Sequence, residues 1–289
     1  MDDRSAVFKK QTNAVAAAAK AIDAWRKAAA KTPADPLAVR EAATKVAETL
    51  AKIPGIESEA RALAAEAKAS ADAAGRVLDR ERAVLAGKVV AALRQAGIPV
   101  DGNLPTLRAG VFSLEFSFLA KGACTIWFGP KKERLASCPL DPEAIASKVV
   151  ELDRALLADD PAGGDFLADL DRAYRVAAFR KGVADGERVP LPLVMAELAF
   201  ARQDATFLAD PRREHFETFG RVEFAARLSR QRERRHADRE LRLDVATMAQ
   251  TRKPEDHLWV PTGRTGDGTN FATLRFVRVR ETDSRERGA

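Results

Sequence analysis

Apolar residues recur every seven positions near the start of the chain. Phe8, Val15 and Ile22 follow one another at this interval, and alanines fill many of the places between them. A seven-residue repeat puts apolar side chains on one face of a helix and is typical of helices that pack along a seam. Alanine also has the highest intrinsic helix propensity. The pattern therefore predicts a helix over residues 4–31 whose seam faces another helix.

Two more helices are predicted before residue 99. A stripe of apolar residues at spacings of three and four, which includes Val46, predicts a helix over residues 36–53. A longer stripe, which includes Leu63, predicts one over residues 56–96. Prolines interrupt the chain between the stripes, and Asp35 is a suitable N-cap for the second helix. The first third of the chain is therefore expected to be an alanine-rich helical hairpin or bundle.

The seam of this helical region is open to two interpretations. In the first, the helices pack on one another as an ordinary intramolecular bundle. In the second, they present the seam to a protein partner or to a second copy of the chain, as in a coiled coil. Alanine buries little apolar area per residue, so an isolated hairpin of this composition would gain stability from such a partner. The candidate partner-binding residues are Phe8, Val15, Ile22, Val46 and Leu63.

The period of the pattern changes to two after residue 104. Apolar and polar residues alternate over residues 112–118 and 124–128, and a third such run covers residues 134–138. Alternation is the period of a half-buried strand. Helical spacing returns over residues 141–158. The sequence therefore predicts a β-meander covered by a helix, followed by a linker over residues 159–165, which are rich in Asp, Pro and Gly.

Helices and strands are mixed in the last part of the chain. Helices are predicted over residues 166–182 and 190–207, and a shorter one over residues 212–218. Alternating residues predict a long hairpin with strands over 222–228 and 241–247, a connector over 230–239, and further strands over 258–260 and 271–279.

These elements assign the chain to the α+β class, with helix predominating. Three regions are expected: a helical bundle or coiled-coil region over residues 1–99, a small α+β module over residues 100–160, and an arginine-rich α+β module with an antiparallel sheet over residues 166–289.

The charge of the chain allows an anionic partner without requiring one. Lys and Arg number 48 against 42 Asp and Glu, which gives a net charge of +6. The densest basic segment is the connector of the predicted hairpin. Arginine binds phosphate oxygens in a bidentate manner, so DNA or RNA is a candidate partner, and a solvated surface loop is the alternative. The candidate nucleic-acid-binding residues are Arg230, Arg232, Arg234 and Arg235.

The order helix, helix, strand, basic loop, strand in the last region resembles that of a winged helix. The resemblance rests on the order of elements alone and implies a DNA-binding regulator. Its recognition helix would be the one over residues 190–207. The middle of that helix, residues 193–196, is apolar, which favours a buried helix.

No cofactor or metal site is expected from the motifs. Gly263, Gly266 and Gly268 lie between two predicted strands, but the lysine and the following helix of a P-loop are missing, so a hairpin turn is expected there. Cys124 and Cys138 lack the paired spacing of a structural zinc site. Two cysteines also make no disulfide framework, and the simplest expectation is a reducing, cytoplasmic location.

No catalytic motif was found in the sequence, neither a nucleophile elbow nor the acidic motif of metal-dependent nucleases. No apolar run is long enough to span a membrane and no signal peptide is visible, so no membrane partner is expected. The main hypothesis is a non-catalytic subunit or scaffold, with nucleic acid as a candidate second partner. The alternative is an enzyme whose pocket is assembled from distant residues: Glu197, Arg202, Asp204, Arg221 and Glu223.

Overall fold

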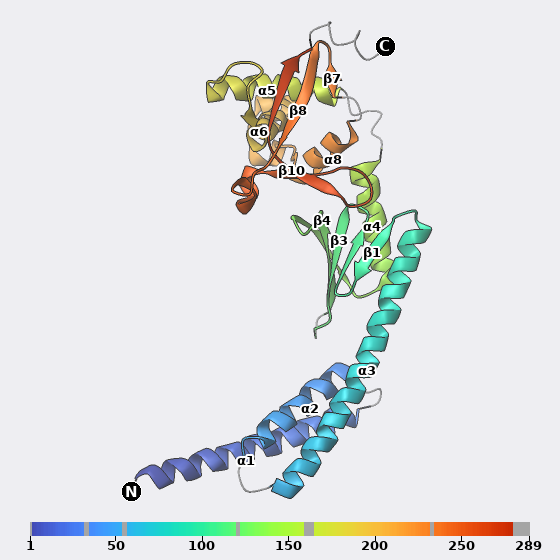
Figure 1. Cartoon of the computed structure of the whole chain (residues 1–289), viewed down its shortest axis with the longest axis vertical. Coiled ribbons are helices and arrows are strands. Elements are labelled where there is room, and N and C mark those ends of the chain that lie inside the picture. Colours follow the sequence, from blue (N-terminus) through green and yellow to red (C-terminus); the bar gives the residue numbers. More distant parts are fainter. Residues whose placement is uncertain are drawn as a thin grey trace. The chain divides into compact units, whose positions relative to one another are not determined.

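The structure is a computed structural model that describes residues 2–31, 35–53, 57–119, 122–158, 165–231 and 234–279. It confirms the predicted α+β class (Figure 1). The chain divides into two compact units. The first, called the helical unit below, contains residues 1–88 and 118–122, and the second, called the mixed unit, contains residues 89–117 and 123–289. The predicted middle and last regions therefore lie largely within one compact unit.

The helical unit contains α1 (Asp2–Ala29), α2 (Pro36–Leu50) and most of α3 (Glu57–Gln95). The Asp35 carboxylate caps α2, because it accepts hydrogen bonds from the backbone N–H groups of Leu37 and Ala38. Small residues dominate the core, and the indole Nε1 of Trp25 donates a hydrogen bond to Ser70 Oγ across it at 3.2 Å. The buried core residues are Ala18, Ala21, Trp25, Val39, Ala43, Val46, Leu50, Ala67 and Ala74.

The first sheet, in the mixed unit, is an antiparallel meander with its strands in chain order. It contains the three predicted strands, β3 (Phe112–Ser117), β4 (Ala123–Phe128) and β5 (Glu133–Pro139), and two that the sequence did not predict, β1 (Val100–Asn103) and β2 (Thr106–Ala109). The predicted helix follows as α4 (Pro142–Leu157), which packs on β5 and turns buried Ile145 and Val149 inward.

The second sheet, also in the mixed unit, has the strand order β6-β10-β8-β7, with β9 paired to β10. All its pairs are antiparallel. Its strands are β6 (Val189–Pro190), β7 (Arg235–His236), β8 (Arg239–Val245), β9 (Leu258–Pro261) and β10 (Gly268–Arg278). The accompanying helices are α5 (Phe166–Lys181), α6 (Leu191–Ala201), α7 (Ala205–Ala209) and α8 (Arg221–Arg230).

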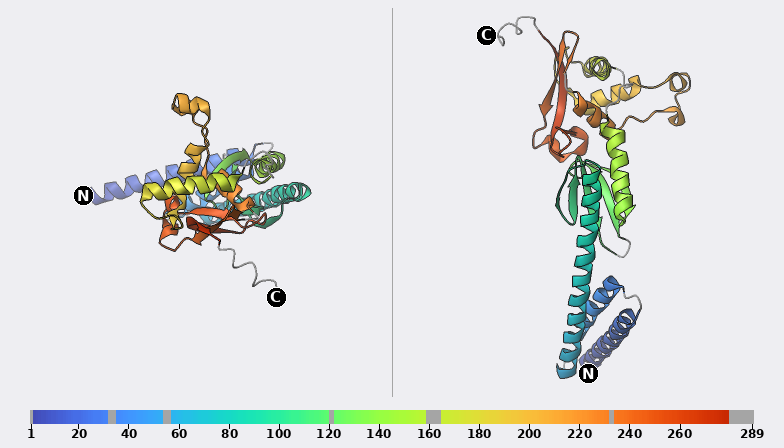
Figure 2. Two further views of the ribbon diagram at one scale, coloured as in Figure 1. Left: turned by 90° about the horizontal axis from the view of Figure 1, so that it is seen from above. Right: turned by 90° about the vertical axis from the view of Figure 1, so that its right-hand side faces the viewer.

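Several predicted elements end where the structure offers a physical reason. The helix α5 stops at Gly182, which has φ 72° and adopts the left-handed conformation that suits glycine. The predicted helix over residues 190–207 is broken after Ala201, and the side chain of Gln203 exchanges hydrogen bonds with the backbone of Glu217. Figure 2 shows the segment that contains α7 standing out from the rest of the mixed unit. The predicted helix over residues 212–218 is only a 3₁₀ turn, Arg213–His215.

One predicted strand is wrong. Residues 222–228 form most of the helix α8, and the predicted long hairpin therefore does not exist. Phe224, Ala225 and Leu228 are buried, which is the face of a helix, while Val222 is only half-buried. The 222–228 run fits both the helical and the strand period. Phe224 and Leu228 lie four positions apart, which is about one helical turn and also an even spacing along a strand. The predicted connector is instead the end of α8 and the short strand β7, which turns into β8 at Ala237 (φ 51°).

The two sheets of the mixed unit meet around Trp259. Its ring packs edge-on against Phe128 of β4, with centroids 5.2 Å apart. Gly129 and Gly268 lie against the same ring, and a Cβ atom at Gly268 would come within 2.5 Å of it. The β9–β10 turn also contacts the meander and its covering helix, because Asp267 pairs with Arg108 of β2 at 3.6 Å and Arg264 pairs with Asp153 of α4. The glycines of this turn therefore serve close packing between the sheets.

Candidate functional site

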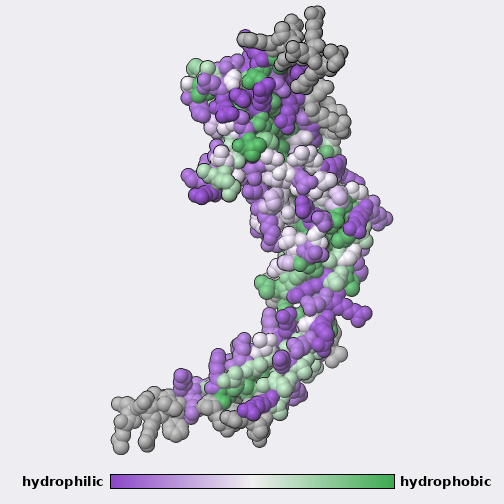
Figure 3. All heavy atoms as spheres, viewed as in Figure 1, coloured by the Kyte–Doolittle hydropathy of each residue, from purple (hydrophilic) through white to green (hydrophobic). Residues whose placement is uncertain are grey.

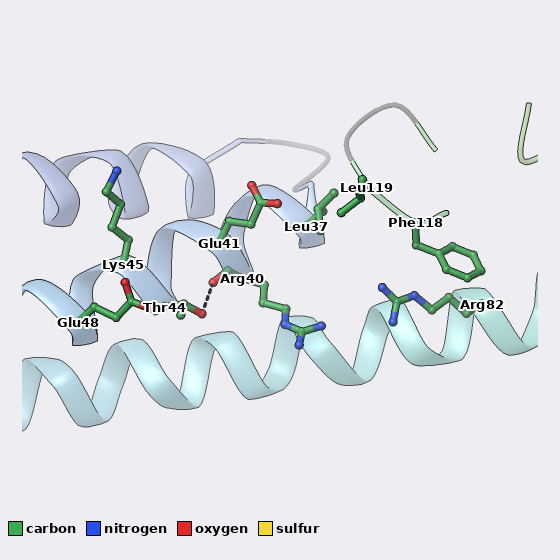
Figure 4. A pocket seen from close by; sticks show the side chains of 9 residues that line it. All are labelled: Leu37, Arg40, Glu41, Thr44, Lys45, Glu48, Arg82, Phe118 and Leu119. Atoms are coloured by element: carbon green, nitrogen blue, oxygen red, sulfur yellow. Dashed lines mark hydrogen bonds between the residues drawn. The ribbon is translucent and has the colours of Figure 1, made fainter. Parts of the chain in front are cut away.

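A groove of about 700 Å³ runs along the outer face of α2 in the helical unit (Figure 4). Its α2 wall comes from residues at helical spacings of three and four, which share one face of the helix. The opposite side comes from α3 and from the segment that follows β3. The lining residues are Leu37, Arg40, Glu41, Thr44, Lys45 and Glu48 of α2, Arg82 of α3, and Phe118 and Leu119.

The α3 side of the groove is held by an arginine that stacks on an aromatic ring. The guanidinium carbon of Arg82 lies 4.7 Å from the centroid of the Phe118 ring. Arg82 is also paired with Asp79 on its own helix at 3.4 Å. Leu119, next to the stacked ring, leaves 73% of its surface exposed. The groove therefore has an apolar end formed by Leu37, Phe118 and Leu119.

Charges of both signs alternate along the rest of the groove. Figure 4 shows Arg40 pointing from α2 toward α3, while Lys45 points away toward α1. Along α2, Glu41 comes between Arg40 and Lys45, and Glu48 follows Lys45. All four residues line the groove. The arrangement suits a partner surface that is apolar at one end and carries charges of both signs along its length.

The first half of α1 provides a second exposed surface in the helical unit. Of residues 9–17, only Ala14 is half-buried, and the others are exposed to solvent in the described part of the chain. Val15 exposes 51% of its surface there. Figure 3 shows pale green, weakly apolar residues along the helical unit, interrupted by purple charged ones. An alanine-rich helix of this length has little stability without packing, so this half of α1 would gain from a partner.

The candidate partner-binding residues divide into two groups. Val46 is fully buried in the core of the helical unit, and Ile22 and Leu63 pack against that core. These three side chains therefore serve the internal bundle. Val15 is exposed and remains a candidate, while the side chain of Phe8 lies outside the described residues. The groove residues of α2 were not singled out in the sequence, although their spacing of three and four was available.

Replacing Val46 by aspartate is expected to unfold the helical unit. A carboxylate at this fully buried position has no partner, and we expect a loss of about 3 kcal/mol or more in the free energy of unfolding. Val15→Asp, at an exposed position of α1, is the matched control and is expected to cost less than about 0.5 kcal/mol. Thermal unfolding followed by circular dichroism measures both. Equal melting temperatures for the two variants would contradict the internal position of Val46.

The candidate nucleic-acid-binding arginines have different surroundings. Arg230 is the last residue of α8, and its guanidinium donates a hydrogen bond to the backbone carbonyl of Ala158. Arg234 and Arg235 are exposed at the start of the second sheet. Arg232 lies outside the described residues. Two of the four arginines are therefore displayed to solvent with their side chains available.

The residues of the enzyme alternative are dispersed. Buried Glu197 pairs with Arg180 at 3.0 Å, Arg202 stacks over Phe219, and Glu223 pairs with Arg227. Asp204 caps α7 by accepting the N–H of Phe207, which lowers the pKa of its carboxyl. Arg221 pairs with Glu133 and lines a cavity described below.

The cysteines lie opposite each other on β4 and β5, both as free thiols. Burial raises the pKa of the Cys124 thiol to about 12, so the thiolate that binds metals or attacks substrates is disfavoured. Within the described ranges, no group of three or more His, Cys, Asp and Glu side chains is placed to hold a metal ion.

None of the helices in the described part of the chain has both the length and the apolar character that crossing a bilayer requires. No protein-family model matches the chain, and no curated protein or solved structure matches it either.

Proposed function

We propose that the chain is a non-catalytic scaffold that binds a helix of a protein partner along the α2 groove. The observation that carries this proposal is the composition of the groove: an apolar end with half-buried Leu37 and Phe118 and exposed Leu119, beside alternating charges, all within one compact unit. Exposed apolar surface rimmed by polar residues is typical of protein interaction sites.

A helix fits the groove better than an extended peptide. Extended peptides bind by adding a strand to an open sheet edge, whereas most residues that line this groove belong to the helix α2, whose backbone hydrogen bonds are made internally. A partner helix can instead place its side chains between those of α2 and α3 by ridge-and-groove packing. Its apolar anchors would lie on Leu37, Phe118 and Leu119, and its charged residues beside Arg40 and Glu41. The partner is either another protein or a second copy of this chain.

Cross-linking from position 119 tests this proposal. A photoreactive benzoylphenylalanine replaces Leu119 in the full chain, and the matched control carries it at Met248, which is exposed in the mixed unit. After irradiation in the native cell, mass spectrometry identifies the linked peptides. We expect position 119 to link to an amphipathic helical segment of one protein, which also tells a second copy from another partner. Equal or absent cross-linking at the two positions would contradict the groove as an interface.

Nucleic-acid binding by the mixed unit is the second candidate, and the strand order favours it. With the short elements α7, β7 and β9 set aside, the chain runs α5, β6, α6, α8, β8, β10, which is a helix, a short strand, two helices and two paired strands, as in a winged helix. The helix in the recognition position is then α8. It packs against α4 and β9, and Arg221 and Arg230 on it already bond to protein groups. Contact with phosphates would therefore fall to Arg234 and Arg235.

Replacing Arg234 and Arg235 by alanine tests this second candidate. If each contacts a phosphate of duplex DNA, log affinity falls with log salt by about 0.9 per contact, and the double variant should flatten the slope by roughly 1.8. Fluorescence anisotropy of a short labelled duplex and a short single strand, at two salt concentrations, measures the slope. The exposed pair Arg212 and Arg213, changed to alanine, is the control. If the double variant has the same affinity and the same salt slope as the wild type, Arg234 and Arg235 do not contact phosphates.

A further inference from the structure

A small, partly open cavity lies in the mixed unit. It has a volume of about 210 Å³ and is bounded by the β4–β5 turn, the first residue of α8, and the segment that leads into β9. Trp259 and Phe128 form its apolar wall. The polar side chains at this cavity come from three separate parts of the sequence: Lys131, Lys132, Glu133, Arg221, Thr251 and His257.

His257 is buried, with 2% of its surface exposed, and its protonation pattern follows from its neighbours. Its Nδ1 lies 2.9 Å from the carbonyl oxygen of Lys253 and 3.2 Å from that of Gln250. Carbonyl oxygens only accept hydrogen bonds, so Nδ1 carries the hydrogen. In the neutral ring Nε2 is then an acceptor, and Lys132 Nζ lies 3.4 Å from it.

The Lys132 ammonium is the least compensated charge of the cavity. Lys131 is paired with Glu115 at 2.5 Å, and its hydrogen bond lowers the pKa of that carboxyl. Arg221 is held by Glu133 at 2.7 Å and by the backbone carbonyls of Pro254 and His257. Lys132, by contrast, has no carboxylate within ion-pair distance among the described residues.

The cavity also adjoins the start of α8, because Arg221 lines it. Arg221 is the first residue of α8, and the N-cap, Gly220, has no side chain to accept hydrogen bonds from the first turn. The N-terminus of a helix carries a partial positive charge and free N–H groups, which favour anions. Together with Lys132, it makes the cavity attractive to a small anion.

We propose that this cavity binds inorganic hydrogen phosphate. The anion would take the place of Lys132 at His257: Lys132 Nζ would donate to its charged oxygens instead of to Nε2, and the P–OH would donate to the Nε2 lone pair thus released. The volume is below that of typical pockets for drug-sized ligands, roughly 300 Å³ or more, and excludes a nucleotide. Sulfate has the same shape but no O–H to donate to His257. A phosphate monoester dianion likewise lacks the O–H and carries an extra substituent.

Titration of the full chain in a phosphate-free buffer at neutral pH tests this proposal. Isothermal calorimetry with sodium phosphate, sodium sulfate and glycerol 3-phosphate compares the three anions. We expect phosphate to bind at least tenfold more tightly than the other two. Lys132→Gln should weaken phosphate binding at least tenfold, because it removes the uncompensated ammonium. Lys253→Gln removes the same charge from an exposed side chain of the neighbouring segment and should leave the affinity unchanged.

Three outcomes would overturn the proposal: no binding of phosphate, equal affinity for sulfate or glycerol 3-phosphate, or equal loss in the Lys132 and Lys253 variants. Lys132 is exposed at the residue level, so Lys132→Gln is expected to fold. Its melting temperature without phosphate verifies this. A rise of the wild-type melting temperature with phosphate, absent in Lys132→Gln, is the independent readout, because a ligand that binds only the folded state stabilises it.

Discussion

Arg239→Met is expected to lower the free energy of unfolding of the mixed unit by about 3–5 kcal/mol. Arg239 and Asp171 are both 4% exposed, and Arg239 Nη1 lies 3.3 Å from Asp171 Oδ1. A second carboxylate, Asp185, lies 2.6 Å from Nη2. The guanidinium also lies against the Tyr174 and Phe276 rings, at 5.7 and 5.6 Å from their centroids. Removing the arginine leaves Asp171 Oδ1 without this partner inside the protein, and only Arg175, 2.6 Å from Oδ2, still compensates the buried carboxylate.

Chemical denaturation of the full chain, followed by circular dichroism, measures this loss. Arg242→Met is the matched control on the same strand, because Arg242 is largely exposed and pairs only with nearby Glu240. It should cost less than about 0.5 kcal/mol. The double variant Arg239→Met with Asp171→Leu should recover part of the stability, since it also removes the buried carboxylate, and the released Arg175 is largely exposed to solvent. If Arg239→Met and Arg242→Met had the same free energy of unfolding, the buried pair of Arg239 and Asp171 would contribute nothing to stability.

Trp259→Ala is expected to cost about 3–5 kcal/mol, because it leaves a large cavity between the two sheets of the mixed unit. Trp259 is buried, and its ring fills the space between Phe128, Gly129 and Gly268. Trp127→Ala is the control, at a half-buried position of β4 whose indole Nε1 donates to Glu115. It should cost about 2 kcal/mol, less than Trp259→Ala, because it loses one hydrogen bond and only part of an indole's buried area.

Gly268→Ala probes the same contact from the other side. Its new methyl group would clash with the indole ring, and we expect it to cost about 1–3 kcal/mol in the wild-type background. In the Trp259→Ala background the ring is gone, and the methyl group should cost much less. This non-additivity identifies direct contact between the two positions. Additive losses would mean that the two residues destabilise the protein independently.

The spacing of apolar residues predicted an element correctly where it fits only the helical period or only the strand period of two. The alternation over residues 112–118 extends far enough to exclude a helix, and β3 was predicted correctly. The heptads of α1 and the alanine-rich stripe of α3 exclude strands in the same way. The strands β1 and β2 were missed because each has four residues, and they are separated by a turn with a cis peptide bond before Pro105.

The α2 groove was missed for a different reason. The lining residues of α2 share one helix face, and the sequence contains that spacing. Phe118 and Leu119, however, come from a segment about seventy residues beyond the end of α2, and no local pattern places it beside this helix. The cavity beside His257 combines the β4–β5 turn, α8 and the segment before β9 in the same long-range manner. Periodicity reports on single elements, so sites assembled by tertiary packing lie beyond it.

Comparative affinity purification from the native cell tests the proposed scaffold function most directly. Three forms of the full chain are compared: wild type, the double variant Leu37→Asp with Leu119→Asp, and Met248→Asp as a control at an exposed position of the mixed unit. Circular dichroism verifies that all three fold. We expect one protein partner, or a second copy of the chain, to be recovered with wild type and Met248→Asp. Its recovery should fall at least tenfold with the groove variant, because burying one leucine contributes about 1.5–3 kcal/mol. Equal recovery with all three forms, or no specific partner with any of them, would contradict the groove as the binding site.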